Sequence, residues 1–264
     1  LSHHSAETLF YKGQKMRIPL ARVPTMGELF DVDQYIHRKA FSPIIDGETS
    51  YKAPSTPFRL FNTPPKFGGN VAGLGFNNSL WDGLNIDDTT DQSLIGDKVS
   101  ELPLQGLTII DLAMGWAGPL AARNLADLGA TVIKVEGCTR FDWFRSWEAS
   151  QEWIDDNGAE KAINFIYVNR NKLDVTLDFE QQVGRELLLK LIGEADAVIE
   201  NYSGGVMPKL KLDYKVLSKI NPELVMVSMP AFGSTGPWSS FRAYGSTVEQ
   251  AAGLPHLQGN QQQP

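Results

Sequence analysis

Short apolar runs alternate with amphipathic segments in the central part of the chain. Residues 107–112 (LTIIDL) and 131–136 (TVIKVE) are β-branched runs of the length that a buried parallel strand needs. A helix is predicted between them over 120–128, because Pro119 suits a first helical position and Gly129 ends the segment. A strand, a helix and a second strand in this order predict a βαβ unit.

The same alternation continues toward the carboxyl end of the chain. Helices are predicted over 184–194 and 214–220, and strands over 173–178, 195–201 and 224–229. This alternation predicts an α/β fold with an open, mostly parallel, Rossmann-like sheet and helices on both faces. Ligands of such sheets bind beyond the carboxyl ends of the strands.

The first 80 residues have a different character, since they are rich in proline and glycine and their patterned pieces are short. Strands or extended stretches are predicted over 17–23 and 57–61, and brief helical turns over 26–30 and 34–39. No run repeats apolar residues over several helical turns. We therefore expect residues 1–80 to form a proline-rich N-terminal strap that completes the sheet domain and does not fold alone.

Composition and charge narrow the class of partner. Residues 81–102 place several carboxylates among small polar residues, which is typical of a solvated acidic linker. The formal net charge of -7 and the lack of a basic patch argue against nucleic acid and against an anionic membrane surface. The single cysteine, Cys138, excludes an intramolecular disulfide framework and fits a cytoplasmic location. The four histidines lack metal-ligand spacing, so no metal is expected.

The loop at 113–119 (AMGWAGP) joins the first predicted strand to its helix, where exposed backbone N–H groups favour an anion. The dinucleotide fingerprint GxGxxG is incomplete, because only Gly115 and Gly118 are present. Glu136 stands at the end of the second strand, where a ribose-binding acid would stand. The alternative is that the glycines only let the chain turn and that Glu136 is a solvated strand end.

A longer series of motifs starts at this loop. The run PLQGLTIIDLAMGWAGPLAARNLADLGATVIKVE (103–136) is followed by DWFR at 142–145, and this series resembles the class III CoA-transferases of the formyl-CoA transferase and carnitine CoA-transferase type. The resemblance covers about residues 102–259. Its later motifs, in family order, are NK at 171–172, VTLD at 175–178, AD at 195–196, ENY at 200–202, NP at 221–222 and FGSTGP at 232–237.

Residues 1–80 resemble the same family out of order. Their motifs IPLARV (18–23), MGEL (26–29), PFRL (57–60) and GLG (73–75) are similar to the end of such an enzyme. An end followed by a beginning implies an internal piece of a tandem-repeat member, in which two repeats are joined head to tail.

The resemblance assigns a part to each stretch and implies a partner repeat or a homodimer that interlocks with it, while the smaller domain of the family is missing. The implied parts are the C-terminal segment of an upstream repeat (1–80), an acidic linker (81–102), the nucleotide-binding part of the next repeat (103–240) and a truncated lead into the catalytic segment (241–264).

The resemblance also implies a reaction. Family members exchange coenzyme A between an acyl-CoA and a small carboxylic acid, through a mixed anhydride and an aspartyl-CoA thioester. Their nucleophilic aspartate lies beyond the position of Pro264. No catalytic residue is therefore named, and we expect this chain alone to be inactive. Coenzyme A is the only cofactor that the resemblance implies.

The resemblance implies site residues only at positions that align with those of the family, at the ends of the first strands. Trp116 stands where the family often has a glutamine near the thioester, and Gly137 replaces an arginine that can bind near the adenine. Lys209 and Arg242 are expected to bind phosphate through charge-assisted hydrogen bonds, although lone basic residues are more often solvated. The aligned positions are Met114, Gly115, Trp116, Ala117, Gly137, Asn171, Lys172, Asn201, Tyr202, Lys209, Leu210 and Arg242.

Other readings stay open at this point. Asn171 and Lys172 could form a turn before a strand without any part in binding. Asp142 and Arg145 could pair on an exposed turn or serve a structural purpose near the active site. Trp143 is expected in a core or interface. For the whole chain, the alternatives are an α-methylacyl-CoA racemase-like enzyme, which needs a pair of proton-transferring bases, and a non-catalytic CoA-binding or assembly half of a tandem protein.

Overall fold

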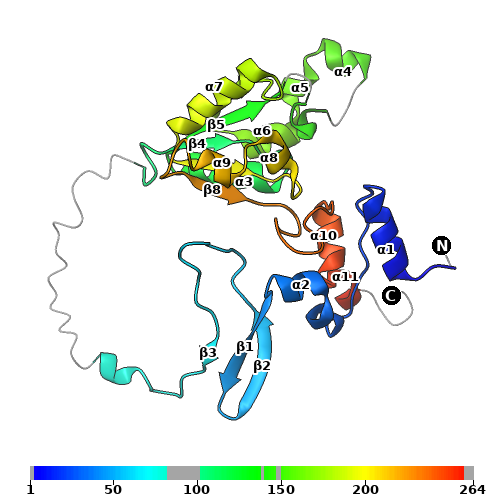
Figure 1. Ribbon diagram of the computed structural model, residues 1–264, viewed down its shortest axis with the longest axis vertical. Helices are drawn as coiled ribbons and strands as arrows, with labels where there is room; N and C mark the ends of the chain where they lie inside the picture. Colours follow the sequence, from blue (N-terminus) through cyan, green and yellow to red (C-terminus); the bar gives the residue numbers. More distant parts are fainter. Residues whose placement is uncertain (1–2, 82–101, 138–139, 147–149, 259–264) are drawn as a thin grey trace. The chain divides into compact units, whose positions relative to one another are not determined.

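The computed structural model describes residues 3–81, 102–137, 140–146 and 150–258, and the chain divides into two compact units (Figure 1). One unit, the sheet unit, comprises Val99–Ser234 and Ser239–Arg242. The other, the composite unit, comprises Leu1–Lys98, Thr235–Trp238 and Ala243–Pro264. Residues 82–101 of the predicted linker and Cys138 lie outside the described residues.

The sheet unit contains five parallel strands in the order β6-β5-β4-β7-β8. The first strand of the unit lies in the middle, and the chain adds strands first on one side and then on the other. The prediction of an open parallel sheet is confirmed. The strands are β4 (Thr108–Asp111), β5 (Thr131–Glu136), β6 (Lys172–Thr176), β7 (Ala197–Glu200) and β8 (Val225–Ser228).

Helices cover both faces of this sheet, because successive strand residues point to opposite sides. Ile109 packs with Ala122 and Ala126 of α3 (Ala117–Asp127), whereas Ile110 packs with Leu188 of α7 (Gln182–Gly193). The α3 face also carries α6 (Ile163–Asn169), which contacts α3. The α7 face includes Met207 of α8 (Val206–Leu210) and Leu217 of α9 (Tyr214–Leu217).

Several short elements of the sheet unit were not predicted, since each has fewer residues than a helical period needs to become visible. They lie mostly between β5 and β6, where the apolar residues come in short runs and form no repeated helical stripe. These elements are η3 (Trp143–Ser146), α4 (Gln151–Asp155), α5 (Gly158–Lys161), α6 and α8.

The composite unit begins with α1 (Ala6–Lys15), which the sequence pattern did not predict although Ser5 caps it by accepting a hydrogen bond from the Thr8 amide. Residues 17–23 and 57–61 lie outside the strands of this unit, so the alternative of a strand there was wrong and that of an extended stretch stays a prediction. The hairpin forms instead from β1 (Phe41–Asp46) and β2 (Thr49–Pro54). The remaining elements are η1 (Glu28–Asp31), α2 (Asp33–His37), β3 (Gly69–Asn70), η2 (Asn78–Leu80), α10 (Gly245–Ala251) and α11 (Leu254–Leu257).

Residues from both ends of the sequence hold the composite unit together. Gln34, which is fully buried, donates from Nε2 to the Thr235 carbonyl (2.9 Å) and accepts at Oε1 from the Trp238 amide (2.9 Å). The Tyr35 hydroxyl donates to the Ala251 carbonyl at 2.8 Å. The first residues therefore pack with segments more than 200 positions later, and docking of residues 1–80 on the sheet stays a prediction.

Candidate functional site

The loop after β4 lies at the switch point of the sheet, between β4 and β7, where doubly wound sheets bind their ligands. Asn201, the residue after β7, holds this loop from the other side. Its Oδ1 accepts from the Met114 amide (2.9 Å), and its Nδ2 donates to the Met114 carbonyl (2.7 Å). Two predicted site residues therefore meet and join the loops of the two strands.

The next residue of the loop, Gly115, has to be glycine. Its φ of +74° is a conformation that side chains disfavour, and an added Cβ would lie 2.2 Å from Cζ2 of Trp143. Its amide donates to both carboxylate oxygens of Asp142, at 3.0 and 3.1 Å. Glycine is therefore required here because the Trp143 side chain packs against it. The Gly115 amide already has a partner in Asp142 and is not available to a ligand.

The candidate anion site therefore shifts by one residue along the loop. Among the described residues, none accepts a hydrogen bond from the amides of Trp116, Ala117 or Gly118 at the start of α3. These groups belong to the first turn of an 11-residue helix, where the helix dipole also favours a negative or partly negative atom.

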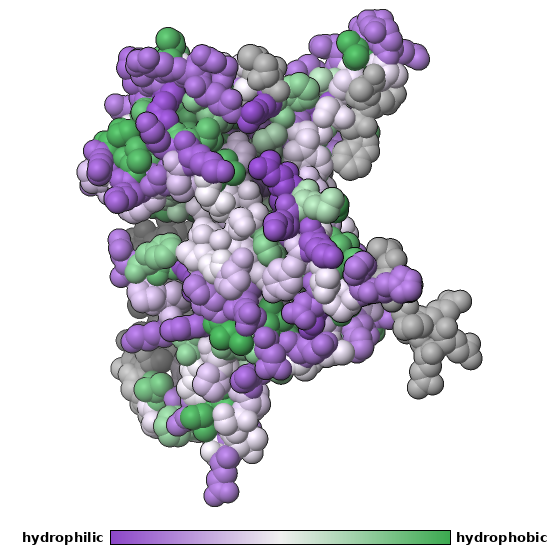
Figure 2. Space-filling model, turned by 45° about the vertical axis from the view of Figure 1, so that its right-hand side comes forward, coloured by the Kyte–Doolittle hydropathy of each residue, from purple (hydrophilic) through white to green (hydrophobic). Residues whose placement is uncertain are grey.

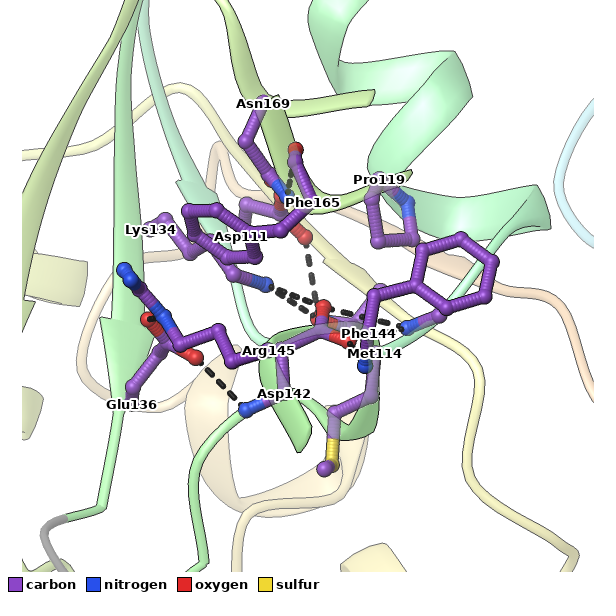
Figure 3. A network of polar contacts seen from close by, with 12 residues as sticks. Asp111, Met114, Pro119, Lys134, Glu136, Asp142, Phe144, Arg145, Phe165 and Asn169 are labelled. Carbon is purple, nitrogen blue, oxygen red and sulfur yellow. Dashed lines mark hydrogen bonds and ion pairs between the residues drawn. The ribbon is translucent and has the colours of Figure 1, made fainter. Parts of the chain in front are cut away.

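A buried ion pair supports the loop from beneath. Lys134 of β5 places Nζ 3.0 Å from Oδ2 of Asp142, and both side chains are at most 1% exposed. The same ammonium donates to the Ala113 carbonyl at 2.8 Å. Figure 3 shows the Lys134 ammonium and the Asp142 carboxylate pointing toward one another. A pairing of Asp142 with Arg145 on an exposed turn was the wrong alternative, because each is buried and has a partner on β5.

Arg145 is the second cation of this network. Its Nε donates to Glu136 Oε2 (2.8 Å), its Nη2 pairs with Asp174 (3.0 Å), and its guanidinium lies 3.5 Å from the Phe165 ring centroid. Glu136 accepts at its other oxygen from the Asp142 amide (2.6 Å) and is 7% exposed. Glu136 is therefore neither a solvated strand end nor placed for a ribose, because both of its oxygens have partners inside the protein.

These contacts move the pKa values of the two carboxyl groups in opposite directions. Burial raises the pKa of Glu136, but the hydrogen bonds from Arg145 and the Asp142 amide outweigh it, so this pKa is lowered. For Asp174, burial and the neighbouring Glu136 raise the pKa to about 6. Glu136 is thus the more acidic partner of the two.

A second buried ion pair joins β6 to β4. Lys172 Nζ lies 2.7 Å from Asp111 Oδ2 and also donates to the Pro119 carbonyl and to Asn169 Oδ1, each at 2.8 Å. Burial lowers the pKa of Lys172, and Asp111 opposes this shift. Asn171 has a φ of +61° and donates to Asp127 of α3. The structure thus places Lys172 beneath the loop and Asn171 in a turn.

The remaining predicted positions differ in their exposure. Tyr202 is mostly buried, its amide donates to Glu200, and burial raises its pKa to about 12. Gly137 forms an isolated bridge with Arg140. Lys209, in the last turn of α8, and Arg242 are exposed, while Leu210 packs against the core and its carbonyl accepts from Arg185.

Trp116 lies at the surface of the loop, and the structure surrounds it with aromatic residues that were not predicted as site residues. Its ring centroid lies 5.9 Å from that of Phe144 and 5.8 Å from that of Tyr167. Lys134 and Asp111 were also missed. Their signal was present, because a lysine and an aspartate inside otherwise apolar strands require buried partners.

No group of three or more histidine, cysteine, aspartate or glutamate residues in the described part of the chain is placed to hold a metal ion. Among the helices of the described residues, none is both long enough and apolar enough to cross a bilayer.

Comparisons with known proteins agree with the motifs. The family model described as CoA-transferase family III matches residues 104–264, more than half of the chain. The chain is 38% identical over 167 residues to an acyl-CoA transferase of Fusarium pseudograminearum, covering 62% of this chain and 37% of that protein. It is 36% identical over 157 residues to the succinate–glutarate CoA-transferase of Agrobacterium fabrum, with shares of 60% and 39%.

Two further matches concern the length of the relatives and their fold. A Mycobacterium tuberculosis protein named "Probable CoA-transferase Rv1866" is 36% identical over 160 residues, which are 61% of this chain but only 19% of that protein. The structure of a CAIB/BAIF family protein from Brucella suis superposes with a TM-score of 0.53 at 38% identity, over 61% of this chain and 42% of that one. The chain thus spans about two fifths of the length of most of these relatives.

Proposed function

Because this chain belongs to CoA-transferase family III, we propose that it carries the CoA-binding sheet of an enzyme that exchanges CoA between an acyl-CoA and a small free carboxylic acid. The observation that carries the proposal is the loop at the switch point. Asn201 and Asp142 fix its backbone, and the amides of the exposed residues Trp116 and Ala117 have no partner among the described residues. The family match covers this loop and the sheet around it.

Each group has a part in holding the substrate. The amides at the start of α3 receive a carbonyl or phosphate oxygen of the CoA ester, where the helix dipole strengthens the hydrogen bonds. Lys209 and Arg242 bind phosphate through charge-assisted hydrogen bonds. Lys134, Asp142 and Lys172 do not touch the ligand, since their charges are satisfied inside the protein, and they fix the loop that does.

The chemistry needs a carboxylate nucleophile, which we place after Pro264. That carboxylate attacks the acyl thioester and releases CoA thiolate, so that an acyl-carboxyl anhydride forms. The thiolate then attacks the enzyme carbonyl of the anhydride, which frees the first acid and leaves an enzyme–CoA thioester. The incoming carboxylate and the thiolate complete the exchange in the reverse order, so no oxidant or proton source is consumed.

We further propose that the chain spans the junction of two repeats, with a partner repeat or homodimer that interlocks with it in the cytoplasm. The end-like motifs before the beginning-like motifs support this arrangement. So does the length of one relative, because the matched segment is 19% of the Rv1866 protein and 39% of the Agrobacterium protein. A family member of about double length therefore exists.

The test uses the intact protein. It is incubated with acetyl-CoA or succinyl-CoA and a panel of free mono- and dicarboxylic acids, and new CoA esters are measured by mass spectrometry. A new ester that depends on both the donor and the acid is expected. A 2-methylacyl-CoA of one configuration is tested in parallel, and if only its stereochemistry changes, the protein is a racemase. If calorimetry shows CoA binding without any exchange, the non-catalytic alternative holds.

A further inference from the structure

Three aromatic rings form a surface beside the start of α3, which we call the aromatic shelf: Trp116, Phe144 and Tyr167. Trp116 is 50% exposed and Tyr167 is 48% exposed, whereas Phe144 beneath them is 4% exposed. Phe144 meets Trp116 edge-on at 85°, and Tyr167 lies tilted at 34° to it. Large apolar rings thus face solvent on one side and are packed on the other. Hydrophobic residues also stand among hydrophilic ones at the surface in Figure 2.

The shelf is held from behind by buried groups. Phe144 belongs to a cluster with Phe165 and Val168 of α6. Arg123 of α3 lies 5.0 Å from the Tyr167 ring centroid, and its guanidinium donates to the Tyr167 carbonyl at 3.2 Å. Trp116 follows directly after the clamped residues of the loop. Rings that are fixed in this way present a ready surface to a ligand at a low cost in side-chain entropy.

The position of the shelf determines which part of a ligand reaches it. The amides that are available for a ligand oxygen belong to the exposed residues Trp116 and Ala117, so a carbonyl bound there lies next to the Trp116 side chain. In a CoA thioester, the group attached to that carbonyl is the acyl chain. The faces of aromatic rings carry negative charge and disfavour a carboxylate. The nearby cation, Arg123, is already engaged with Tyr167 and Asn124.

We propose that the aromatic shelf binds the acyl group of the CoA thioester and that this acyl group is apolar, with a preference for chains longer than acetyl over chains that end in a carboxylate. This inference rests on the proposed function and deepens it by naming the class of donor. Trp116 and Tyr167 are then specificity-determining residues. Phe144 and Arg123 position them.

Calorimetric titration of residues 1–264 tests the proposal with four ligands: CoA, acetyl-CoA, hexanoyl-CoA and succinyl-CoA. Hexanoyl-CoA has four more methylene groups than acetyl-CoA, and covering about half of their surface raises the affinity about tenfold. Succinyl-CoA is expected to bind no better than acetyl-CoA. In Trp116→Ala the tenfold difference between hexanoyl-CoA and acetyl-CoA disappears, and in Tyr167→Ala it shrinks.

The matched control is Trp81→Ala, which removes an equally large, 67% exposed ring from the composite unit and is expected to keep the tenfold difference. Trp116→Phe, which keeps an aromatic ring, should restore most of it. Circular dichroism identifies any variant that fails to fold, and if Trp116→Ala is one of them, the reduced difference expected in Tyr167→Ala carries the test.

The outcomes separate the two proposals. If none of the four ligands binds, the proposed function fails and the shelf proposal fails with it. If CoA binds but acyl length has no effect in the wild type, the shelf proposal alone is overturned. It is also overturned if adenosine 3′,5′-bisphosphate loses as much affinity in Trp116→Ala as hexanoyl-CoA does, because the shelf then stacks the base.

Discussion

The two units of the chain are stabilised in different ways. The sheet unit has an apolar cluster on each face of the sheet, a further cluster around Phe144, and buried ion pairs that tie neighbouring strands and loops. The composite unit contains few fully buried side chains, and the amide of Gln34 is the most buried of its polar groups. Its segments come from opposite ends of the sequence. The sheet unit therefore distributes its stability over many contacts, whereas the composite unit concentrates it in a few.

This difference determines how each unit should respond to damage. A buried ion pair contributes little when it is intact, because desolvation offsets the attraction, but removing one partner leaves a buried charge uncompensated. A buried amide that loses its partners costs less, since no net charge is left behind. Single substitutions of the ion pairs should therefore be more harmful than those of Gln34.

The largest effect is expected for Lys134→Met. The substitution keeps a long apolar side chain but leaves the Asp142 carboxylate buried without its cation, which should lower the free energy of unfolding by about 3–5 kcal/mol. Urea unfolding, followed by hydrogen exchange of β5, measures the loss. Lys190→Met on the exposed side of α7 is the control and should change little. A loss below about 1 kcal/mol in Lys134→Met would contradict the support that we assign to this pair.

A glycine pair gives the next test within the sheet unit. Gly115→Ala and Gly106→Ala both place a side chain at positive φ, but only the new Cβ at 115 would overlap a neighbour, Cζ2 of Trp143 at 2.2 Å. The shared conformational cost is about 1–2 kcal/mol, and the overlap should add about 1–3 kcal/mol at 115 alone. Thermal unfolding of the two variants gives the difference. Equal losses would show that Trp143 moves away freely.

Gln34→Ala carries the comparison into the composite unit. The change removes a donor to Thr235 and an acceptor from Trp238, and leaving those buried backbone groups unpaired should cost about 1–3 kcal/mol. Hydrogen exchange should rise over residues 235–238 but not in β4 or β5. Gln105→Ala, on an exposed turn, is the matched control. Faster exchange throughout the sheet unit would show that the two units unfold together.

The contrast between the units also explains what the sequence could reveal. The strand predicted over 131–136 is β5 (Thr131–Glu136), because its apolar run and its flanking glycines are local features. Helix α1 was missed, since Phe10 is the only large apolar side chain that it buries and the partner of Phe10, Trp238, lies more than 200 positions later. The hairpin was missed although its strands are adjacent in the sequence, because their side chains are mostly exposed and show no apolar alternation. The pairing of Lys134 with Asp142 was missed although the two residues are close in the sequence. A charged residue in an apolar strand indicates that the fold must supply a partner of opposite charge, but the sequence does not show which residue this is.

The smallest effect concerns pH and tests the carboxyl pair at the edge of the sheet. The pKa of Asp174 is raised from 3.8 to about 6, so the folded protein binds a proton that the unfolded chain has already lost between these values. The stability contribution of this group is therefore fully present below about pH 4 and is lost as the pH rises toward 6. Asp174→Asn cannot ionise and escapes this loss, so its stability relative to the wild type should improve from pH 4 to pH 7.

The Asp174 side chain is 36% exposed, and solvent screening limits the improvement to less than about 1 kcal/mol. Glu136, whose pKa is lowered, has the opposite dependence at more acidic pH, so the comparison is made above pH 4. Melting temperatures of both proteins over this pH range measure the effect. The series is repeated in about 0.5 M salt, where the screening length falls to about 5 Å. The difference in melting temperature between the two proteins should shrink in salt. A difference that stays constant with pH would mean that Glu136 does not raise the pKa of Asp174.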